Sequence, residues 1–510
     1  MPAARLVLDS AFALAPVPHR LFGSFVEHMG RCVYTGIYEP GHPLADEDGQ
    51  RKDVLELTRE VGPTVVRYPG GNFVSNYRWE DGIGPKDERP TRLDLAWHSV
   101  ETNQFGLHDF MSWARKAGTE PMMAVNLGTR GLQEACDLIE YTNHAGGTYW
   151  SDRRIANGAP DPYGIKLWCL GNEMDGPWQV GHKTAAEYGR LANETGKAMR
   201  LVDGDIELVA CGSSNSAMPT FGAWESTVLD LTYDTVDYIS LHAYYEERDD
   251  DALSFLASAV NMDRFIESVV ATADAVRARK GRSKRINLSF DEWNVWYQRR
   301  FSGDGPKPSH VDWTPQPRLI EDEYTVTDAV VVGTLLNSLL RHGDRVTVAC
   351  QAQLVNVIGL LRSEPGGEAW KQTIAYPFEQ MRRLARGQIL HVVATSDLFD
   401  SEAYTDVPLV DASATYDAET GRCAVFVANR SLTDTATLEI DLRGVGGTAV
   451  LAATTLHAGG DQGRHTTNLE RHDAVTPARF DDHAVRDGQL TATLPALSWT
   501  VFEVDARREG

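Results

Sequence analysis

Short, unbroken apolar runs recur along the first three quarters of the chain, separated by longer segments with apolar residues at helical spacing. Such runs are typical of fully buried strands, because a strand covered on both faces needs no polar alternation. Eight occur, over residues 21–27, 64–70, 121–126, 166–173, 206–211, 238–244, 286–292 and 346–353. Helical periodicity lies between them, for example over residues 53–61, 107–117, 184–202, 262–279 and 325–341. Eight strand-helix repeats without a dinucleotide-binding glycine signature predict a closed (β/α)8 TIM barrel, an α/β fold.

After about residue 390 the pattern changes to strand-like stretches divided by turn clusters. The stretches 423–429, 438–442 and 499–504 are strand-like, and Gly-containing clusters such as 444–447 separate them. This alternation predicts a C-terminal antiparallel β-sandwich, jelly-roll-like in layout.

The first residues of the chain also contribute to this prediction. Residues 5–18 indicate a strand with turn chemistry, closed by Pro16 and Pro18, and we expect it to join the sandwich. The predicted division is therefore a barrel at residues 19–388, and a sandwich domain made of residues 1–18 plus 389–510.

Composition narrows the range of partners. At 510 residues the chain exceeds what one core usually supports. Its formal net charge of −23 argues against nucleic acid and against an anionic membrane surface, because both would be repelled.

The six cysteines are scattered, without Cys-x-x-Cys spacing, and are expected to be buried thiols. With no signal-like or membrane-spanning apolar segment, the expected location is the cytoplasm.

Two of the predicted strands end in glutamates. Glu173 follows Gly171 and Asn172 at the end of one strand, and Glu292 ends another, between Asp291 and Trp293. In a barrel, the carboxyl ends of the strands carry the active site. Paired carboxyl groups there are suited to glycoside hydrolysis, retaining or inverting, although either glutamate alone is more simply an exposed acid.

The other strand ends are rich in polar groups, with tryptophans beside them. Sugars need such paired donors and acceptors, and their C–H faces rest on aromatic rings. The flanking tryptophans are Trp79, Trp178, Trp293 and Trp296, most of which are more simply explained by core or lid packing. The polar strand-end residues are Glu27, His28, Arg67, Asn72, Asn126, Asn172, His242, Tyr244 and Gln353. No Asp, Glu and His cluster has the spacing of a catalytic metal site, so we expect no metal and no cofactor.

Several long motifs occur across the barrel, from Leu21 to about residue 360, among them VVRYPGGNFVSNYRWEDGIGP, ETNQFGLHDFM, WCLGNEMDG, SLHAYY and LSFDEWNVWY. In sequence and in order they resemble the motifs of glycoside hydrolase family 51, the intracellular α-L-arabinofuranosidases. The resemblance implies that Glu173 is the acid/base and Glu292 the nucleophile of a retaining reaction.

The same resemblance implies roles for other residues. Residues that match positions holding the furanose hydroxyls are Glu27, Asn72, Asn172, Tyr244 and Gln353, and Trp296 resembles a residue lining the sugar pocket. Arg67 and His242 resemble residues that support the catalytic pair, and an arginine beside Glu292 would favour its ionised form.

The implied substrate is an arabinose-containing oligosaccharide, and the implied assembly is a homo-oligomer, often a hexamer in the family. Two alternatives stay open at this point. The same pair of glutamates could act on another glycoside, such as a β-xyloside or β-glucan, or the barrel could bind carbohydrate without hydrolysing it, although the paired glutamates argue against the latter.

Overall fold

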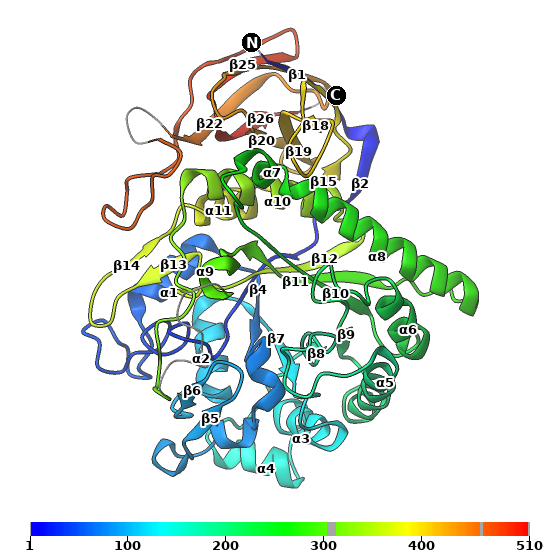
Figure 1. Cartoon of the computed structure of the whole chain (residues 1–510), viewed down its shortest axis with the longest axis vertical. Coiled ribbons are helices and arrows are strands. Elements are labelled where there is room, and N and C mark those ends of the chain that lie inside the picture. Colours follow the sequence, from blue (N-terminus) through cyan, green and yellow to red (C-terminus); the bar gives the residue numbers. More distant parts are fainter. Residues whose placement is uncertain (1, 303–312, 459–462, 508–510) are drawn as a thin grey trace.

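The computed structural model describes residues 2–302, 313–458 and 463–507. Eight parallel strands form a closed barrel in the spatial order β10-β11-β12-β3-β4-β7-β8-β9 (Figure 1). They are β3 (Arg20–Phe25), β4 (Val65–Tyr68), β7 (Glu120–Val125), β8 (Leu167–Leu170), β9 (Glu207–Ala210), β10 (Tyr238–Tyr245), β11 (Asn287–Val295) and β12 (Val346–Gln351). Each lies within or overlaps one of the eight predicted runs, so the predicted TIM barrel is confirmed.

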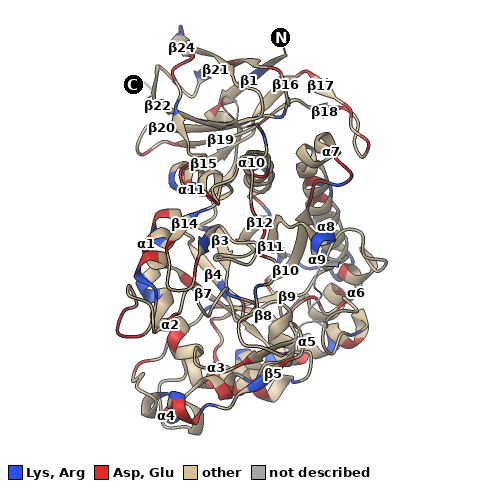
Figure 2. Ribbon diagram, turned by 60° about the vertical axis from the view of Figure 1, so that its left-hand side comes forward, with Lys and Arg blue, Asp and Glu red and all other residues tan. Residues whose placement is uncertain are grey.

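Helices surround the barrel, and charged residues lie mainly on these helices and on loops (Figures 1 and 2). The helices are α1 (Lys52–Val61), α2 (Leu107–Ala117), α3 (Leu132–Asn143), α4 (Tyr149–Ala156), α5 (Ala185–Val202), α6 (Ala223–Thr232), α7 (Ala252–Leu256), α8 (Ser258–Lys280), α9 (Gln298–Ser302), α10 (Val326–Arg341) and α11 (Ala375–Leu384). Short 3-10 turns η2 (Asn72–Asn76), η3 (Trp79–Gly82) and η4 (Lys86–Glu88), with the hairpins β5 (Arg92–Asp94)–β6 (Ser99–Glu101) and β13 (Leu361–Ser363)–β14 (Ala369–Lys371), complete the barrel domain. Among the described residues, no helix combines the length and the apolar character needed to cross a membrane.

Two sheets pack face to face above the barrel. The first has the order β2-β15-β19-β20-β26-β22-β23 and the second β16-β1-β21-β25-β24. The strands of the first sheet are β2 (Ala13–Pro16), β15 (Gln388–Leu390), β19 (Val410–Asp417), β20 (Arg422–Asn429), β22 (Ala449–His457), β23 (Ala478–Arg479) and β26 (Ser498–Asp505). Those of the second are β1 (Ala3–Asp9), β16 (Val393–Ser396), β21 (Ala436–Gly444), β24 (His483–Arg486) and β25 (Gln489–Leu494), and a small hairpin pairs β17 (Leu398–Phe399) with β18 (Val407–Pro408).

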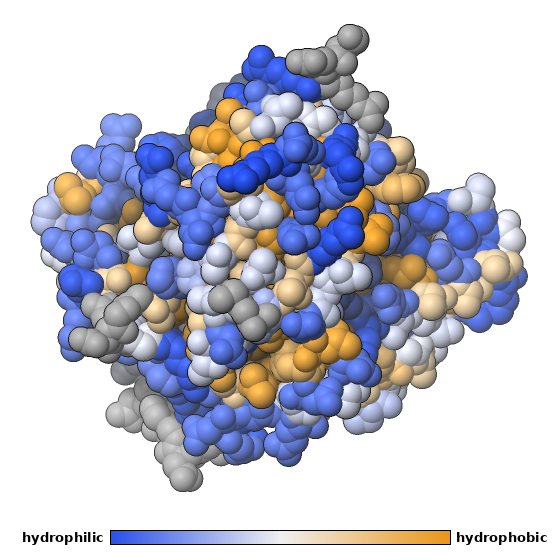
Figure 3. Space-filling model, turned by 90° about the horizontal axis from the view of Figure 1, so that it is seen from above, coloured by the Kyte–Doolittle hydropathy of each residue, from blue (hydrophilic) through white to orange (hydrophobic). Residues whose placement is uncertain are grey.

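The sandwich core lies between these sheets and includes Leu6, Val425, Leu438 and Phe502. The predicted sandwich is confirmed, with one departure from a purely antiparallel pattern, because β1 runs parallel to β21. From the sandwich end, most of the surface is hydrophilic, with small apolar patches (Figure 3).

The N-terminal strands pair with the C-terminal part of the chain. β1 (Ala3–Asp9) pairs with β16 and β21, and β2 (Ala13–Pro16), which follows the turn η1 (Ser10–Phe12), pairs with β15. These pairings support the division into residues 19–388 and residues 1–18 plus 389–510. The exact boundaries stay a prediction. The cysteines are free thiols, five of them buried and Cys136 only half-buried.

The helix α10 joins the two domains. It is buried along almost its whole length, because barrel strands and α8 cover one side and strands of the sandwich cover the other. Trp499 of β26 packs against Gly333 of this helix, and its indole Nε1 donates to Gln380 Oε1 of α11 at 3.0 Å. Nearby, Asn337 Nδ2 donates to Asp411 Oδ2 at 2.9 Å across the same interface.

This contact predicts the effect of Gly333→Ala. A Cβ at position 333 would overlap the Trp499 ring, so the variant should lose about 1–3 kcal/mol of unfolding free energy through overpacking. Gly189→Ala in α5 is the matched control, because the only atom within 3.0 Å of its new Cβ would be the terminal methyl of Leu231, a 39% exposed residue, and the nearest backbone atom, Val228 Cα, would lie at 3.3 Å. Urea denaturation compares the two. Equal losses would show that the Trp499 contact is not tight.

Candidate active site

Glu173 and Glu292 come from strands β8 and β11 and meet at the carboxyl end of the barrel. β8 is buried along its length. It is followed by Gly171, whose φ is 91°, and Glu173 has a φ of 44°. A left-handed backbone is uncommon for glutamate, and it turns this side chain from the strand end back over the barrel mouth.

The strand β11 carries two neighbouring carboxylates into the same interior. In a regular strand Asp291 and Glu292 would face opposite sides. The pairing of β11 shifts register here, between Ser240 and His242 on the β10 side and between Phe290 and Trp293 on the β12 side. Such irregularities redirect side chains. Both carboxyl groups are buried as a result, and both contact His242.

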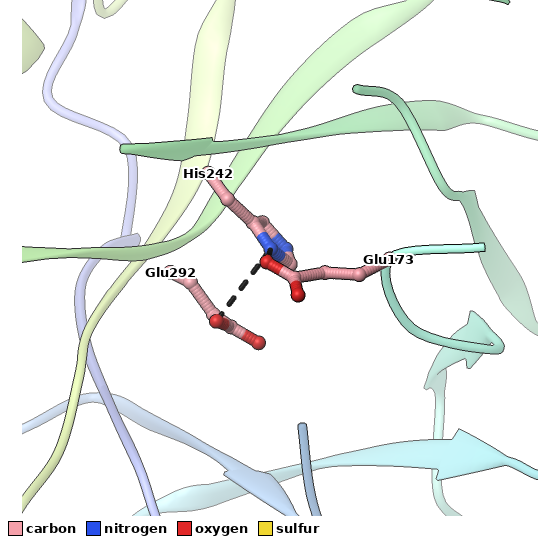
Figure 4. A group of neighbouring side chains, drawn as sticks. All are labelled: Glu173, His242 and Glu292. Carbon is pink, nitrogen blue, oxygen red and sulfur yellow. Dashed lines mark hydrogen bonds and ion pairs between the residues drawn. The ribbon is translucent and has the colours of Figure 1, made fainter. Parts of the chain in front are cut away.

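His242 of β10 connects the carboxyl groups (Figure 4). Its Nδ1 lies 3.0 Å from Glu173 Oε1 and 3.5 Å from Glu292 Oε2, and its Nε2 lies 3.0 Å from Asp291 Oδ1. One oxygen of Glu173, one oxygen of Glu292 and a ring nitrogen of His242 all lie within 4.8 Å of one another. The two glutamates are thus close enough to act on one bond.

Arg67 of β4 holds Glu292 from the other side. Its guanidinium Nη1 donates to Glu292 Oε1 at 2.6 Å, and its Nη2 donates to Asn172 Oδ1 at 2.6 Å. The ring of Phe25 lies 4.8 Å from the guanidinium carbon. Tyr244 Oη donates to the second oxygen of Glu292 at 2.9 Å. Glu292 is therefore ion-paired and oriented at both oxygens.

The surroundings of Glu173, His242 and Asp291 shift their pKa values in different directions. Burial raises the pKa of Glu173, the hydrogen bond from His242 opposes this, and the charge of Glu292 adds to the rise. For His242, burial alone would lower the pKa, but Glu292, Asp291 and Glu173 together raise it to about 10. Burial acts to raise the pKa of Asp291, yet the charge of Arg67 and the His242 hydrogen bond lower it. This environment favours a protonated Glu173 and a charged His242.

Glu173 has one more partner. Trp178 Nε1 donates to Glu173 Oε2 at 2.6 Å, and Trp178 is 50% exposed. This tryptophan therefore lies at the outer side of the acid, where a leaving group would approach.

The carboxyl groups line a cavity of about 1070 Å³. Among its lining residues are five that the sequence predicts as sugar-binding, namely Glu27, Asn72, Tyr244, Trp296 and Gln353. Asn172 lies behind them and donates from Nδ2 to Asn72 Oδ1 at 3.2 Å. Arg67 and His242 are buried behind the glutamates. All ten predicted site residues are thus brought together.

Glu27 is held by three donors in the cavity wall. It accepts from the Phe73 amide at 3.0 Å, from Trp97 Nε1 at 2.9 Å and from Gln353 Nε2 at 3.1 Å. Burial raises the pKa of Glu27 to about 8. The Phe73 hydrogen bond opposes this rise, and the charge of Glu292 adds to it.

Other strand-end residues lie away from the cavity. Asn126 accepts from the Thr129 amide of its own loop at 3.0 Å and donates to Tyr77 O, after η2, at 2.9 Å. His28 is buried between Glu101 and Tyr68. Trp79 and Trp293 are core residues. Conversely, sequence reasoning missed Trp97 and residues 402–404, which line the cavity. Neither belongs to a strand-end pattern, so periodicity carried no signal for them.

Glu173, His242 and Glu292 are also spaced closely enough to hold a metal ion. However, both ring nitrogens of His242 face carboxylate oxygens, and its pKa of about 10 keeps the ring protonated at neutral pH. A protonated imidazole has no lone pair to offer a metal. The donor set therefore fits a proton-sharing site better than a metal site.

A closed parallel barrel with two adjacent glutamates at the ends of β8 and β11 defines a barrel glycosidase site. Comparisons with known proteins agree. The α-L-arabinofuranosidase 1 domain matches residues 57–264, and the α-L-arabinofuranosidase C-terminal domain matches residues 291–498. The chain belongs to the α-L-arabinofuranosidases of glycoside hydrolase family 51.

Individual relatives cover nearly the whole chain. The intracellular exo-α-(1→5)-L-arabinofuranosidase of Streptomyces lividans is 56% identical over 98% of this chain and 75% of its own length. The exo-α-(1→6)-L-arabinofuranosidase of Bifidobacterium longum is 52% identical over 98% of this chain and 97% of its own. The solved structure of a family 51 α-L-arabinofuranosidase from the same organism is 50% identical, with a TM-score of 0.94 over 99% of this chain and 100% of its own.

The buried Glu27 predicts a pH dependence of stability. Its folded pKa of about 8 exceeds the ordinary 4.5, so its stabilising contribution is complete below about pH 4.5 and is lost as the pH rises to about 8. Across that window, the unfolding free energy of the wild type should fall relative to Glu27→Gln by up to about 1.4 kcal/mol per pH unit. Denaturant titrations at several pH values measure this.

An exposed glutamate of α1 provides the control. Glu56→Gln removes one carboxylate without touching the cavity, and its stability should follow the wild-type pH curve. A Glu27→Gln curve parallel to the wild type would mean that Glu27 is ionised in the folded protein at neutral pH.

Proposed function

We propose that the chain is a retaining, exo-acting glycosidase that removes terminal non-reducing α-L-arabinofuranosyl residues from arabino-oligosaccharides or arabinoxylan fragments. The observation that carries the proposal is the pair Glu173 and Glu292, within 4.8 Å of each other and in contrasting environments. Retaining enzymes have their carboxyl groups about 5 Å apart, whereas inverting enzymes need about 6.5–9.5 Å to admit a water.

In the first step Glu292 is the nucleophile and attacks the anomeric carbon, while Glu173 transfers its proton to the departing glycosidic oxygen. The ion pair with Arg67 and the hydrogen bond from Tyr244 orient the attacking carboxylate. The raised pKa of Glu173, set by burial, supports its role as the acid. A glycosyl ester on Glu292 results.

In the second step Glu173, now ionised, accepts a proton from water. As that proton leaves, the water oxygen attacks the anomeric carbon and breaks its bond to Glu292, which departs as a carboxylate, so the product keeps the configuration of the substrate. His242 and Arg67 are positioning residues throughout, since each acts through the glutamates. The furanose hydroxyls are assigned to Glu27, Asn72, Asn172, Tyr244 and Gln353, with Trp296 lining the pocket.

The proposal also covers the glycosidic linkage that is cleaved, the cellular location and the oligomeric state. Relatives of similar identity are named for (1→5) and for (1→6) linkages, so we propose no single linkage. The relatives named intracellular support a cytoplasmic location and imported oligosaccharides of arabinan breakdown as substrates. The family resemblance supports a homo-oligomer such as a hexamer.

Because the two glutamates have different roles, their alanine variants should differ in which substrates they still react with. Glu292→Ala should lose activity on every substrate, because no glycosyl ester can form. Glu173→Ala should still form the ester from an activated aryl arabinofuranoside, whose leaving group needs no proton. It should therefore show a burst, partial rescue by azide with retained configuration, and a far larger loss on natural linkages. Rapid-quench kinetics measure the burst.

Thermal unfolding of each variant separates chemistry from folding, and Glu56→Ala is the control for loss of a carboxylate. If Glu292→Ala keeps activity on activated substrates while Glu173→Ala does not, the two roles are reversed. If both variants stay near the wild type, the reaction occurs elsewhere.

A substrate panel tests the two alternatives. The wild type should hydrolyse 4-nitrophenyl α-L-arabinofuranoside far faster than 4-nitrophenyl β-xyloside, and should release no reducing sugar from β-glucan. A preference for the xyloside or the glucan would favour another glycoside as substrate. Binding without hydrolysis of any of them would favour a carbohydrate-binding barrel.

A further inference from the structure

The cavity that contains the glutamates continues to the C-terminal domain. Glu27, Glu173 and Glu292 line one part of it, and residues 402–404 of the sandwich line another part, which we call its outer end. Its volume of about 1070 Å³ is at the upper limit of the roughly 300–1,000 Å³ typical of small-molecule pockets. A single pentose fills only part of this space, so the outer part has room for further sugar units.

A built contact holds the sandwich segment at the cavity. Residues 400–406 connect β17 to β18 and reach down to α7 and α8 (Figures 1 and 2). The Ala403 amide donates to Ser254 Oγ of α7 at 3.0 Å, and the Ser401 amide donates to Tyr404 O at 2.8 Å. The guanidinium carbon of Arg264, on α8, lies 5.8 Å from the centre of the Tyr404 ring. Tyr404 is thus a half-buried aromatic ring fixed at the outer end of the cavity.

Amide and hydroxyl groups form the wall between the two ends. Asn261 of α8 accepts from Tyr245 Oη at 3.2 Å and donates from Nδ2 to Ser216 Oγ at 3.2 Å. These contacts tie the loop after β9 to the end of β10. The loop after β9 is also anchored beside the acid, because the Ser214 amide donates to Asp175 Oδ2 at 3.1 Å. The wall therefore runs outward from the Glu173 side of the site.

Three of the carboxylates along this wall are already engaged within the protein. Glu246 pairs with Arg248 at 3.1 Å, and Asp249 pairs with Arg299 at 2.6 Å. Asp251 accepts from the Ser254 amide at 3.0 Å, at the start of α7. Apart from the exposed Glu402, hydroxyl, amide and aromatic groups remain to meet a ligand, and this combination suits an uncharged sugar.

We propose that the outer part of the cavity is a binding site for the leaving-group side of the substrate, with Tyr404 of the sandwich domain as a residue that determines chain-length preference. The ligand is a neutral pentose chain. The proposal rests on the proposed function, because it needs the terminal arabinofuranosyl unit at Glu173 and Glu292. The remaining units of the pentose chain would then extend past Glu173 toward Tyr404, whose ring supplies an apolar face for a sugar.

The test compares substrates that do and do not reach Tyr404. Specificity constants, kcat/KM, are measured for 4-nitrophenyl α-L-arabinofuranoside and for linear arabinofuranosyl oligosaccharides of two to five units. Tyr404→Ala should leave the aryl substrate and the disaccharide unchanged, and lower kcat/KM about threefold to tenfold for the longer chains, the typical size of one aromatic contact. Tyr404→Phe keeps the ring and should behave as the wild type.

Tyr149→Ala is the control, since Tyr149 is 68% exposed on α4 and outside the cavity. Two outcomes would overturn the inference: unchanged constants for every chain length in Tyr404→Ala, or an equal loss on the aryl substrate and the long chains. Failure of the wild type to hydrolyse any arabinofuranoside would instead overturn the proposed function. Melting temperatures of all variants show that the comparison is made between folded proteins.

Discussion

The buried ion pair between Arg67 and Glu292 is the interaction on which the rest of the site depends. Charges buried in a protein are costly unless they are paired and hydrogen-bonded. Here Arg67 and His242 supply two positive charges, and Asp291 and Glu292 two negative ones. Glu173 is a fifth titratable group in the same enclosed space. Its raised pKa, which burial and the charge of Glu292 both favour, is thus a consequence of how its neighbours are paired.

The same pairing connects the chemistry to the barrel. Arg67 comes from β4, Glu173 follows β8, His242 lies in β10 and Glu292 in β11. Four strands that are far apart in sequence therefore meet through hydrogen bonds of about 3 Å or less between rigid elements. Functional groups on strands are placed more exactly than groups on free loops. The pairing at Asp291 and Glu292 departs from regular strand geometry, and this departure brings both carboxylates inside.

The β-sandwich contributes to the site as well as to stability. It packs on α10 through Trp499 and the Asn337–Asp411 hydrogen bond, so its position relative to the barrel is set by a buried interface. From that position the segment between β17 and β18 reaches the cavity that the barrel strands open. The sandwich domain thus takes part in forming the wall of the binding cavity.

The sequence by itself determined the eight barrel strands and the sandwich, because burial on both strand faces leaves continuous apolar runs. The polar residues that end these runs mark the barrel mouth, and the family resemblance selected the ten predicted site residues among the strand-end residues. It did not reveal Trp97 beside Glu27, the shared contacts of His242 with three carboxyl groups, or residues 402–404 at the cavity. These depend on loops and on a second domain, whose placement follows from packing between distant segments. Local periodicity has no information about such contacts, and only the tertiary structure decided them.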